Sequence, residues 1–332
     1  MTTSSTTSVT TMRAITQSRY GSPEVLHLTQ VPRPTIGADE VLVQVRAAGL
    51  DRGTEHLMTG KPYAMRLGVG LRRPRNPVPG RDVAGVVAEV GSSVNRFTVG
   101  DEVYGVAPGS FAEYAVAPKA KLARKPANLT FAQAAVVPIS AGTALQALQD
   151  VGRLATGQSV LVLGASGGVG TYAVQLAKAL GAEVTGTCST AKLDLVSSLG
   201  ADHVLDYTRD DFADGTRRYD LILDIGGSPS LTRLRRALTP RGTVVFVGSE
   251  GSGSLTGMGR QVRGALLSPV LRQRLVLLLS KERGTDYERL TALLEAGQIS
   301  PSLDRAYPLD EVPAAMRLLE DGRVRGKIAI TV

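Results

Sequence analysis

The sequence contains one cysteine, Cys188, and only three histidines in 332 residues. A single cysteine excludes an intrachain disulfide and a cluster of thiolate metal ligands. It is also typical of a reducing compartment, so we expect a cytoplasmic protein. The longest apolar run covers residues 275–279, far short of the length that crosses a bilayer. We therefore expect neither a disulfide scaffold nor a membrane span.

The chain also lacks a block of basic residues, although its formal net charge is +8. The excess is mostly arginine spread along the sequence, without a lysine tail or a basic stretch interleaved with aromatics. This pattern favours a small anionic partner such as a nucleotide over specific binding of nucleic acid. Residues 1–11 are rich in Ser and Thr and lack the regions of a signal peptide, so we expect a disordered tail.

Two patterns divide the rest of the chain. Residues 12–128 contain short apolar runs separated by Gly and Pro, such as 41–45, 85–90, 102–106 and 111–116. They predict a compact β-barrel-like domain with little helix. Residues 129–280 alternate helical periods with strand runs at 160–163, 183–187, 203–206, 221–224 and 243–248, which predicts an α/β domain with a doubly wound parallel sheet. Residues 281–332 end in a strand that we expect to return to the first domain.

One segment of the second domain, 258–280, sets leucines against arginines and is interrupted by Ser268 and Pro269. We predict a pair of amphipathic helices that pack on the domain. A contact with a membrane surface or with a second subunit is the alternative.

The strongest local signal is the glycine-rich turn that follows the run 160–163. Its spacing is A-x-G-x-x-G, with alanine at the first glycine of the usual fingerprint. Glycines let a pyrophosphate approach the backbone, and the N-terminus of the following helix stabilises its charge. We predict a dinucleotide site made by Gly164, Ala165, Ser166, Gly167, Gly168, Val169 and Gly170. The segment 224–227 and the residues Val247, Gly248 and Ser249 should line the same crevice.

The residues beyond the next strand favour NADPH over NADH. An NAD site carries a carboxylate about twenty positions past the loop, but this chain has Cys188 there. Ser189 and Lys192 follow, and both can donate hydrogen bonds to a 2′-phosphate, with no carboxylate to repel it. A solvated Lys192 is the alternative. Cys188 is expected to fill the strand end rather than to act as a reactive thiol.

Several motifs together resemble the zinc-independent quinone oxidoreductases of the medium-chain dehydrogenase/reductase superfamily. Beside the glycine-rich turn, they are YGSPEVL (20–26), AAGLD (47–51), PGRDVAGVV (79–87), FTVGDEV (97–103), LGADHV (199–204) and RGKI (325–328). The resemblance covers about residues 12–332. It implies a chaperonin-10-like catalytic domain, a Rossmann domain, a nicotinamide cofactor between them and a homodimer.

The resemblance also suggests further contacts with the cofactor. Similar quinone oxidoreductases bind the 2′-phosphate through a serine and a lysine that match Ser189 and Lys192, and through a tyrosine that matches Tyr207. A basic residue near the C-terminus sometimes helps, which makes Arg325 or Lys327 a candidate. For Tyr207, a surface or core aromatic is the alternative.

The departures from the zinc-dependent relatives bear on the chemistry. Those relatives place a cysteine at the position of Asp51, and a histidine followed by glutamate at Arg81 and Asp82. The lobe that holds their structural zinc is missing here. The resemblance thus implies no resident metal, although Asp51, His56 and Asp82 could in principle gather around one.

Four residues are candidates for catalysis. Thr143 matches a helix start that faces the nicotinamide in relatives, where its hydroxyl orients the carboxamide or only caps the helix. His56 matches a proton-relay histidine, with a surface histidine as the alternative. Asp51 either binds a ribose or a water or, as we favour, pairs with Arg81. Tyr63 lies in the arginine-rich loop 60–76, which closes over an acidic or acyl-carrier substrate or, as we favour, is solvated.

These observations lead to one predicted reaction. Without a Lewis acid, adding hydride to a carbonyl-activated double bond is easier than deprotonating an alcohol. We predict an NADPH-dependent, zinc-free oxidoreductase that reduces an enal, an enone or a quinone, with His56, Tyr63 or water as proton donor. A metal-assisted alcohol or carbonyl dehydrogenase and a non-catalytic NADPH-sensing protein are the alternatives. The motifs do not specify the physiological substrate.

Overall fold

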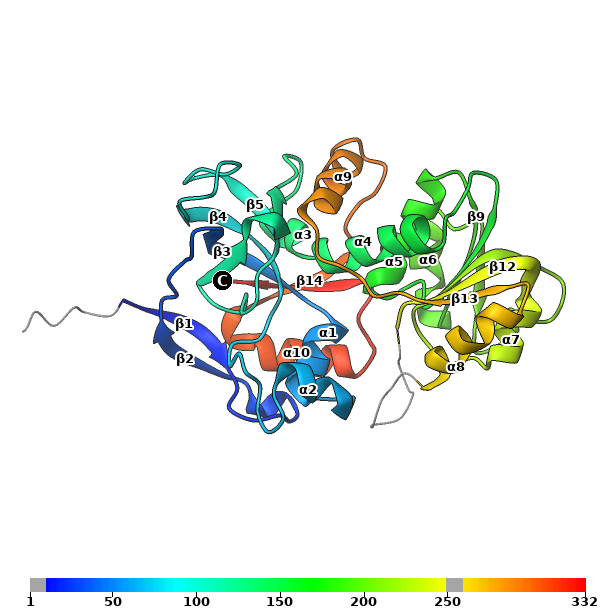
Figure 1. The fold of residues 1–332 in the computed structure, drawn as a ribbon, viewed down its shortest axis with the longest axis horizontal. Coiled ribbons are helices and arrows are strands. Elements are labelled where there is room, and N and C mark those ends of the chain that lie inside the picture. The colour runs from blue at the N-terminus through cyan, green and yellow to red at the C-terminus, as the bar shows by residue number, and fades with distance from the viewer. Residues whose placement is uncertain (1–9, 249–258) are drawn as a thin grey trace, which may run out of the picture.

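The computed structural model describes residues 10–248 and 259–332 and shows two lobes joined by long connections (Figure 1). The second lobe is a six-stranded parallel sheet in the order β10-β9-β8-β11-β12-β13. Its central strands are buried runs of apolar residues, as parallel sheets require. The strands are β8 (Ser159–Leu163), β9 (Glu183–Cys188), β10 (His203–Asp206), β11 (Tyr219–Asp224), β12 (Leu238–Phe246) and β13 (Arg274–Leu277).

The strand order turns back between β8 and β11, which places a ligand crevice at their carboxyl ends. The helices of this lobe are α5 (Gly168–Ala179), α6 (Leu193–Ser198), α7 (Leu231–Ala237) and α8 (Gly259–Leu267). Of these, α5 packs on β8 and β9, and α8 packs on β13. The predicted doubly wound sheet is confirmed.

The first lobe is an antiparallel sheet that also includes the end of the chain. Its order is β14-β15-β3-β4-β5-β7, with β6 paired to β3, and a separate antiparallel pair joins β1 and β2. Because β15 pairs with β3, the last strand closes this lobe. The strands are β1 (Thr11–Thr16), β2 (His27–Pro32), β3 (Glu40–Leu50), β4 (Asp82–Val90), β5 (Glu102–Val106), β6 (Tyr114–Pro118), β7 (Leu122–Arg124), β14 (Leu303–Pro308) and β15 (Lys327–Thr331).

Short helices complete the first lobe and connect it to the second. In the first lobe they are α1 (Arg52–Thr59), α2 (Arg66–Val69) and α10 (Val312–Glu320). The connections are α3 (Phe131–Ala135), α4 (Pro138–Leu145), a π-helical turn (Gln146–Val151) and α9 (Gly284–Glu295). Since α4 packs against both α5 and α9, it lies at the junction of the lobes.

Two predicted elements differ from the structure. The expected helix pair of 258–280 is one helix, α8, followed by the strand β13. Pairing with β12 and burial of Leu275 outweigh the helical pattern of the leucines. At the other end, residues 1–9 lie outside the described residues, and Thr11 belongs to β1 rather than to a tail because it pairs with Pro32.

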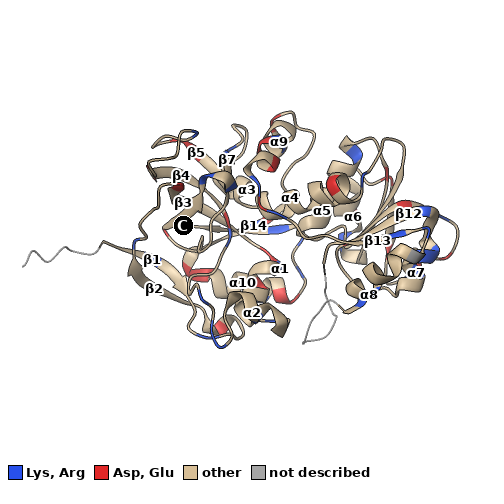
Figure 2. Cartoon of the chain, in the orientation of Figure 1, with Lys and Arg blue, Asp and Glu red and all other residues tan. Residues whose placement is uncertain are grey.

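Basic side chains are distributed over both lobes (Figure 2). Many of them form ion pairs at the surface, such as Arg13 with Glu113 and Lys178 with Asp202. Within the described residues, no helix has the length and apolar character that a membrane crossing requires.

Candidate active site

The turn between β8 and α5 has a tight backbone that only glycine permits at two positions. Gly164 has a φ of 82°. A Cβ built on Gly170 would lie 2.1 Å from the Gly164 carbonyl oxygen. Ala165 is tolerated at the first fingerprint position because its buried methyl group faces Gly186 of β9, where a Cβ would lie only 2.9 Å away. The Ala165 amide donates to the Thr187 carbonyl, which fixes the turn to β9.

Helix α5 begins inside this turn, at Gly168. The first amides of a helix have no intrahelical acceptor, and the helix dipole is positive there, so the turn suits a pyrophosphate. The first residue of the last strand and the glycine before it contact this turn. The Gly326 amide donates to the Ser166 carbonyl at 3.1 Å, and the Lys327 side chain lies 2.8 Å from a Cβ built on Gly168. The predicted phosphate loop therefore lies at the junction of the two lobes.

Lys327 forms a buried ion pair with Asp82, the first residue of β4. The Nζ–Oδ2 distance is 3.4 Å, and the exposed fractions are 2% and 0%. Asp82 Oδ1 accepts a hydrogen bond from the Ile139 amide at the start of α4. Lys327 is thus placed beside the pyrophosphate turn, whereas we had associated it with the 2′-phosphate. Lys327 directly precedes the apolar residues of β15, but the sequence shows neither its burial nor its pairing with Asp82.

Burial raises the pKa of the Asp82 carboxyl to about 7, against the opposing effect of Lys327. In the unfolded chain an aspartate titrates near about 4, so the folded state holds the proton more tightly. We expect the free energy of unfolding to fall as pH rises from about 4 through about 7. Urea unfolding across this range measures how steeply the free energy of unfolding falls with pH. The fall should be smaller in the Asp82→Asn/Lys327→Met double variant than in the wild type. Equal slopes would contradict the prediction.

A second buried ion pair lies at the carboxyl ends of β11 and β12. Asp224 is 1% exposed, and its Oδ2 lies 2.6 Å from Arg260 Nη1. Burial raises the pKa of Asp224 to about 6. A Cβ on Gly248 would lie 2.1 Å from the Ile225 carbonyl oxygen, so the chain turns closely there. Sequence reasoning grouped Arg260 with the amphipathic leucines and missed this pair.

The predicted crevice residues are at this edge of the sheet, beside the phosphate loop. A Cβ on Gly164 would lie 3.0 Å from the Gly226 amide nitrogen, so the ends of β8 and β11 meet there. Val247 and Gly248 follow β12, and both amides donate to the Asp224 carbonyl. Ser249 lies outside the described residues.

The end of β9 carries two cations. Lys192 donates from Nζ to the carbonyls of Gly322 at 2.9 Å and Val324 at 2.7 Å. Arg325 donates to the Ala191 carbonyl at 2.6 Å and pairs with the Asp194 carboxylate at 2.7 Å. Burial lowers the pKa of Lys192, and the neighbouring Arg325 adds to the effect. Two positive side chains thus converge on the turn that follows β9.

The thiol at this end of the sheet is neutral. Cys188 is 1% exposed, and burial raises its pKa to about 11. Ser189 precedes the turn Thr190–Lys192. Tyr207 is exposed, and its amide donates to the Cys188 carbonyl.

The prediction that no carboxylate lies near the 2′-phosphate is wrong, because Asp206 and the Asp194 that pairs with Arg325 are both at this end of the sheet. Asp206, the last residue of β10, pairs with Cys188 across the sheet and accepts a hydrogen bond from the Thr190 hydroxyl. That bond and those from Thr208 lower the pKa of Asp206. Adjacent parallel strands brought it here, which the linear spacing could not show. Hydroxyl and amide groups of Thr190 and Thr208 donate hydrogen bonds to the Asp206 oxygens. These donors offset part of the negative charge that Asp206 places near Lys192 and Arg325.

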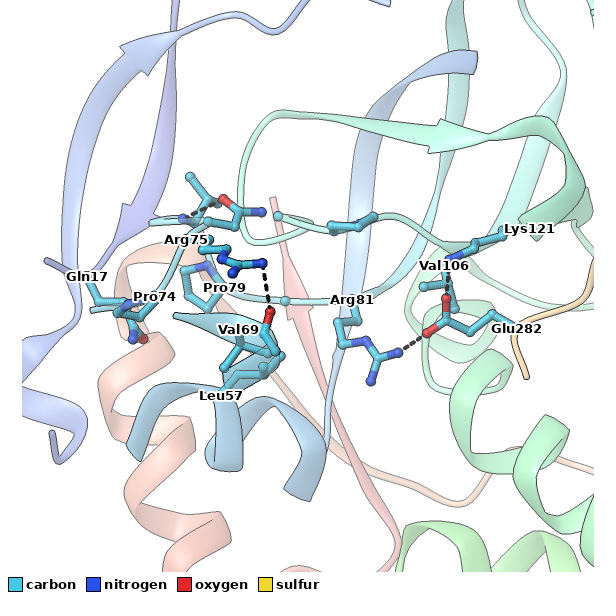
Figure 3. Close-up of a pocket in the computed structure, with 16 residues that line it drawn as sticks. Gln17, Leu57, Val69, Pro74, Arg75, Pro79, Arg81, Val106, Lys121 and Glu282 are labelled. Carbon is cyan, nitrogen blue, oxygen red and sulfur yellow. Dashed lines mark hydrogen bonds and ion pairs between the residues drawn. The ribbon is translucent and has the colours of Figure 1, made fainter. Parts of the chain in front are cut away.

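Two cavities share a wall formed by Arg81 and Glu282, and the smaller of them is lined by α4. The larger, about 370 Å³, is bounded by α1, α2 and the segment 74–81, and by Val106, Pro108 and Lys121 (Figure 3). The smaller, about 50 Å³, is lined by residues that include Ile139, Thr143 and Tyr287.

The four catalytic candidates occupy different places. Thr143 lines the smaller cavity and is 9% exposed. Asp51 caps α1, its Oδ1 accepting from the Thr54 amide at 2.7 Å. His56 lies within α1, and Tyr63, half-exposed, stacks with Arg66. None of Asp51, His56 and Tyr63 is among the described residues that line the two cavities.

The favoured ion pair between Asp51 and Arg81 is wrong. Arg81 pairs with Glu282, from the connection between β13 and α9, and Lys121 pairs with the same carboxylate at 2.6 Å. Asp51 instead serves the α1 N-terminus, and its Oδ2 is buried without a hydrogen-bond partner in the described chain. Glu282 follows a strand and precedes a helix without any sequence motif, so only the three-dimensional structure could identify it.

The structure does not gather the three residues of the metal alternative. The Asp82 carboxylate is engaged by Lys327 and Ile139, and Asp51 by the α1 cap. Across the described residues no three His, Cys, Asp or Glu side chains are placed to hold an ion.

Comparisons with known proteins agree with this arrangement. Residues 37–127 match the family described as alcohol dehydrogenase GroES-like domain, and residues 199–330 match the zinc-binding dehydrogenase family. A 2-methylene-furan-3-one reductase of Solanum lycopersicum is 35% identical, over 96% of this chain and 79% of the relative. A chloroplastic NADPH-dependent alkenal/one oxidoreductase of Arabidopsis thaliana is 34% identical, with the same two coverages of 96% and 79%.

A solved structure shows the same likeness over the whole chain. The quinone oxidoreductase of Coxiella burnetii superposes with a TM-score of 0.86 at 29% identity, covering 97% of this chain and 100% of that one. The relatives include organellar proteins, so the cytoplasmic location stays a prediction. With its GroES-like lobe, Rossmann sheet and these relatives, the chain belongs to the medium-chain dehydrogenase/reductase superfamily and is an NAD(P)H-dependent oxidoreductase of the quinone oxidoreductase type.

Proposed function

We propose that this enzyme uses NADPH to reduce a carbonyl-activated double bond, in an enal or enone, or a quinone, without a zinc ion. The observation that carries the proposal is the larger cavity, whose wall is mainly apolar and ends at the cations Arg81 and Lys121 beside the smaller cavity of Thr143. Such a space suits an apolar hydride acceptor that carries an electron-rich oxygen. The names of the tomato and Arabidopsis relatives, a furanone reductase and an alkenal/one oxidoreductase, support this class.

The residues present fit a nicotinamide dinucleotide. The phosphate loop and Lys327 surround the place of the pyrophosphate, and Lys192 with Arg325 supplies positive charge where a 2′-phosphate would lie. The partnerless Asp51 Oδ2 can accept a hydrogen bond from a ribose hydroxyl. When bound, the reduced cofactor supplies a hydride.

The chain's own residues would position the reactants and manage charge. Thr143, in the wall of the smaller cavity, is placed to orient a carboxamide. His56 and Tyr63 lie outside the cavity walls, so water is the proton donor that this geometry favours. The proposed steps use no metal, and across the described residues no three His, Cys, Asp or Glu side chains are placed to hold one.

The direct test is a titration of the protein with NADPH and with NADH. It is followed by turnover with 1,4-benzoquinone and a short 2-enal, recorded at the reduced-nicotinamide absorbance band. We expect oxidation that prefers NADPH and is unchanged by a chelator. A preference for NADH would overturn the cofactor assignment. Activity that is lost with a chelator and restored by zinc would favour the metal-assisted dehydrogenase.

The cofactor assignment also predicts the effect of Lys192→Gln. A hydrogen bond to a charged phosphate contributes about 1.5–3 kcal/mol, so the Kd for NADPH should rise about ten- to a hundredfold, with that for NADH unchanged. Fluorescence titration of both cofactors measures this. The matched control is Lys178→Gln, which removes the same charge from a surface pair with Asp202 and should change neither Kd. Equal weakening of both cofactors would count against a 2′-phosphate contact.

A further inference from the structure

Three charged side chains meet where the two cavities adjoin. Arg81 Nη2 donates to Glu282 Oε1, and Lys121 Nζ donates to Glu282 Oε2 at 2.6 Å. Figure 3 shows Arg81 reaching along the cavity wall toward this carboxylate. Arg81 directly precedes β4, Lys121 lies in the turn before β7, and Glu282 lies in the connection after β13, so each lobe contributes to the cluster.

The cluster carries a net positive charge. Two cations share one carboxylate, and the side chains are only partly exposed, at 35% for Arg81, 35% for Lys121 and 19% for Glu282. The described hydrogen bond of Arg81 uses Nη2 alone. Its Nη1 lies near the N-terminus of α1, 3.8 Å from a Cβ built on Gly53, with Asp51 Oδ1 3.2 Å from the same point, and Arg81 lines both cavities. The guanidinium therefore has donors to offer to a molecule in the cavity.

Hydrogen bonds to the backbone of Lys281 fix the position of Glu282. Gln146, in the π-helical turn after α4, accepts from the Lys281 amide at 2.9 Å and donates to the Lys281 carbonyl at 2.7 Å. The same amide group donates to Asp286, in the first turn of α9, at 2.7 Å. Because Gln146 is buried, this connection is held to the junction of the lobes and Glu282 presents its carboxylate to the cavity.

We propose that Arg81, aimed by Glu282, binds the carbonyl oxygen of the substrate and stabilises the negative charge that develops there. This rests on the proposed function. The hydride that the reduced cofactor would supply brings the electron pair of the C–H bond broken there, forms a C–H bond at the β-carbon and leaves the cofactor oxidised. The π electrons of the double bond shift to the bond between the α-carbon and the carbonyl carbon, and those of the carbonyl move to its oxygen, giving an enolate. A proton from water then adds at the α-carbon, the carbonyl re-forms, and hydroxide is left in the solvent.

Arg81 suits this role for a physical reason. An arginine stays protonated, so it donates hydrogen bonds to an oxyanion without acting as the acid. Preorganised donors of this kind act most strongly where charge appears only in the transition state. Arg81 occupies the position at which the zinc-dependent relatives place a histidine ligand, so a guanidinium would stand where those enzymes have a metal. Glu282 is a positioning residue.

The test uses turnover and an equilibrium probe of the oxyanion. Arg81→Met should lower kcat for a 2-enal by about a hundredfold or more, with a smaller change in KM. 4-Nitrophenol, whose phenolate mimics an enolate oxygen, should bind the wild type better as the phenolate, seen by its absorbance. Arg81→Met should lose that preference and Arg81→Lys should keep part of it. Unchanged kcat or an unchanged phenolate preference in Arg81→Met would overturn the proposal.

Two further variants keep the test decisive. Arg72→Met removes the same charge from an exposed position outside the cavity wall and should behave as the wild type. If Arg81→Met does not fold because Glu282 loses a partner, the Arg81→Met/Glu282→Gln double variant removes both charges and takes its place. A wild type that binds phenolate through Arg81 but turns over no enal or quinone would refute the proposed function and leave the oxyanion site standing.

Discussion

Gly170→Ala should weaken the binding of NADPH and NADH alike, by on the order of a hundredfold. The added Cβ would lie 2.1 Å from the Gly164 carbonyl oxygen and 2.7 Å from Ala165 Cα. Both are backbone atoms that cannot move aside without opening the loop, and shifts of about 1 Å in a binding geometry are enough for a loss of about 10²-fold. Fluorescence titration with each cofactor measures the effect.

The control for Gly170→Ala is Gly259→Ala at the start of α8, where no atom of the described residues lies within 4 Å of the added Cβ. It should bind both cofactors as the wild type does. Circular dichroism and thermal unfolding separate a local change in the loop from loss of the fold. If Gly170→Ala keeps wild-type affinity, the loop is not the place where the pyrophosphate binds.

Lys327→Met should destabilise the protein by about 3–5 kcal/mol, the cost of leaving one partner of a buried ion pair uncompensated. Asp82 is 0% exposed and Lys327 is 2% exposed, so water cannot replace the lost partner. Urea unfolding at pH 7.5 measures the change. At lower pH the loss should shrink, because Asp82 can then bind a proton instead of remaining an unpaired charge.

Two comparisons interpret this loss. The Asp82→Asn/Lys327→Met double variant removes both charges while an amide oxygen can still accept from Ile139, so it should recover much of the stability. Lys178→Met breaks an exposed pair with Asp202 and should cost no more than about 1 kcal/mol. If Lys327→Met loses as little stability as Lys178→Met does, the buried Lys327–Asp82 pair contributes no more to stability than an exposed pair, and the prediction is wrong.

The sequence was most informative where function depends on consecutive residues. The strand, glycine turn and helix at 159–179 are one local unit, and their spacing alone predicted the loop. The run from Cys188 to Lys192 is also local, and the structure brings Arg325 to it from the far end of the chain. Five of the six strands of the parallel sheet, all but β13, were recognisable because burial on both faces favours apolar runs.

The rest depended on pairings between distant residues. Glu282 reaches Arg81 across 201 positions, and Lys327 reaches Asp82 across 245. The sequence does not show which charged residues form a pair. The prediction that Asp51 pairs with Arg81 rested only on their positions, at which the zinc-dependent relatives have metal ligands. Similarly, β13 was mistaken for helix because leucine and arginine favour helices locally, whereas pairing with β12 decides the outcome.

The antiparallel pairing of β15 with β3 has a consequence for how the chain is synthesised. Every strand of the parallel sheet lies between Ser159 and Leu277, whereas the first lobe needs strands from both ends of the chain. On the ribosome the parallel sheet is therefore complete before the other lobe can close, although that lobe's first residues emerge earlier. Until residues 327–331 appear, β3 keeps an exposed edge where β15 will pair, the kind of surface that chaperones protect.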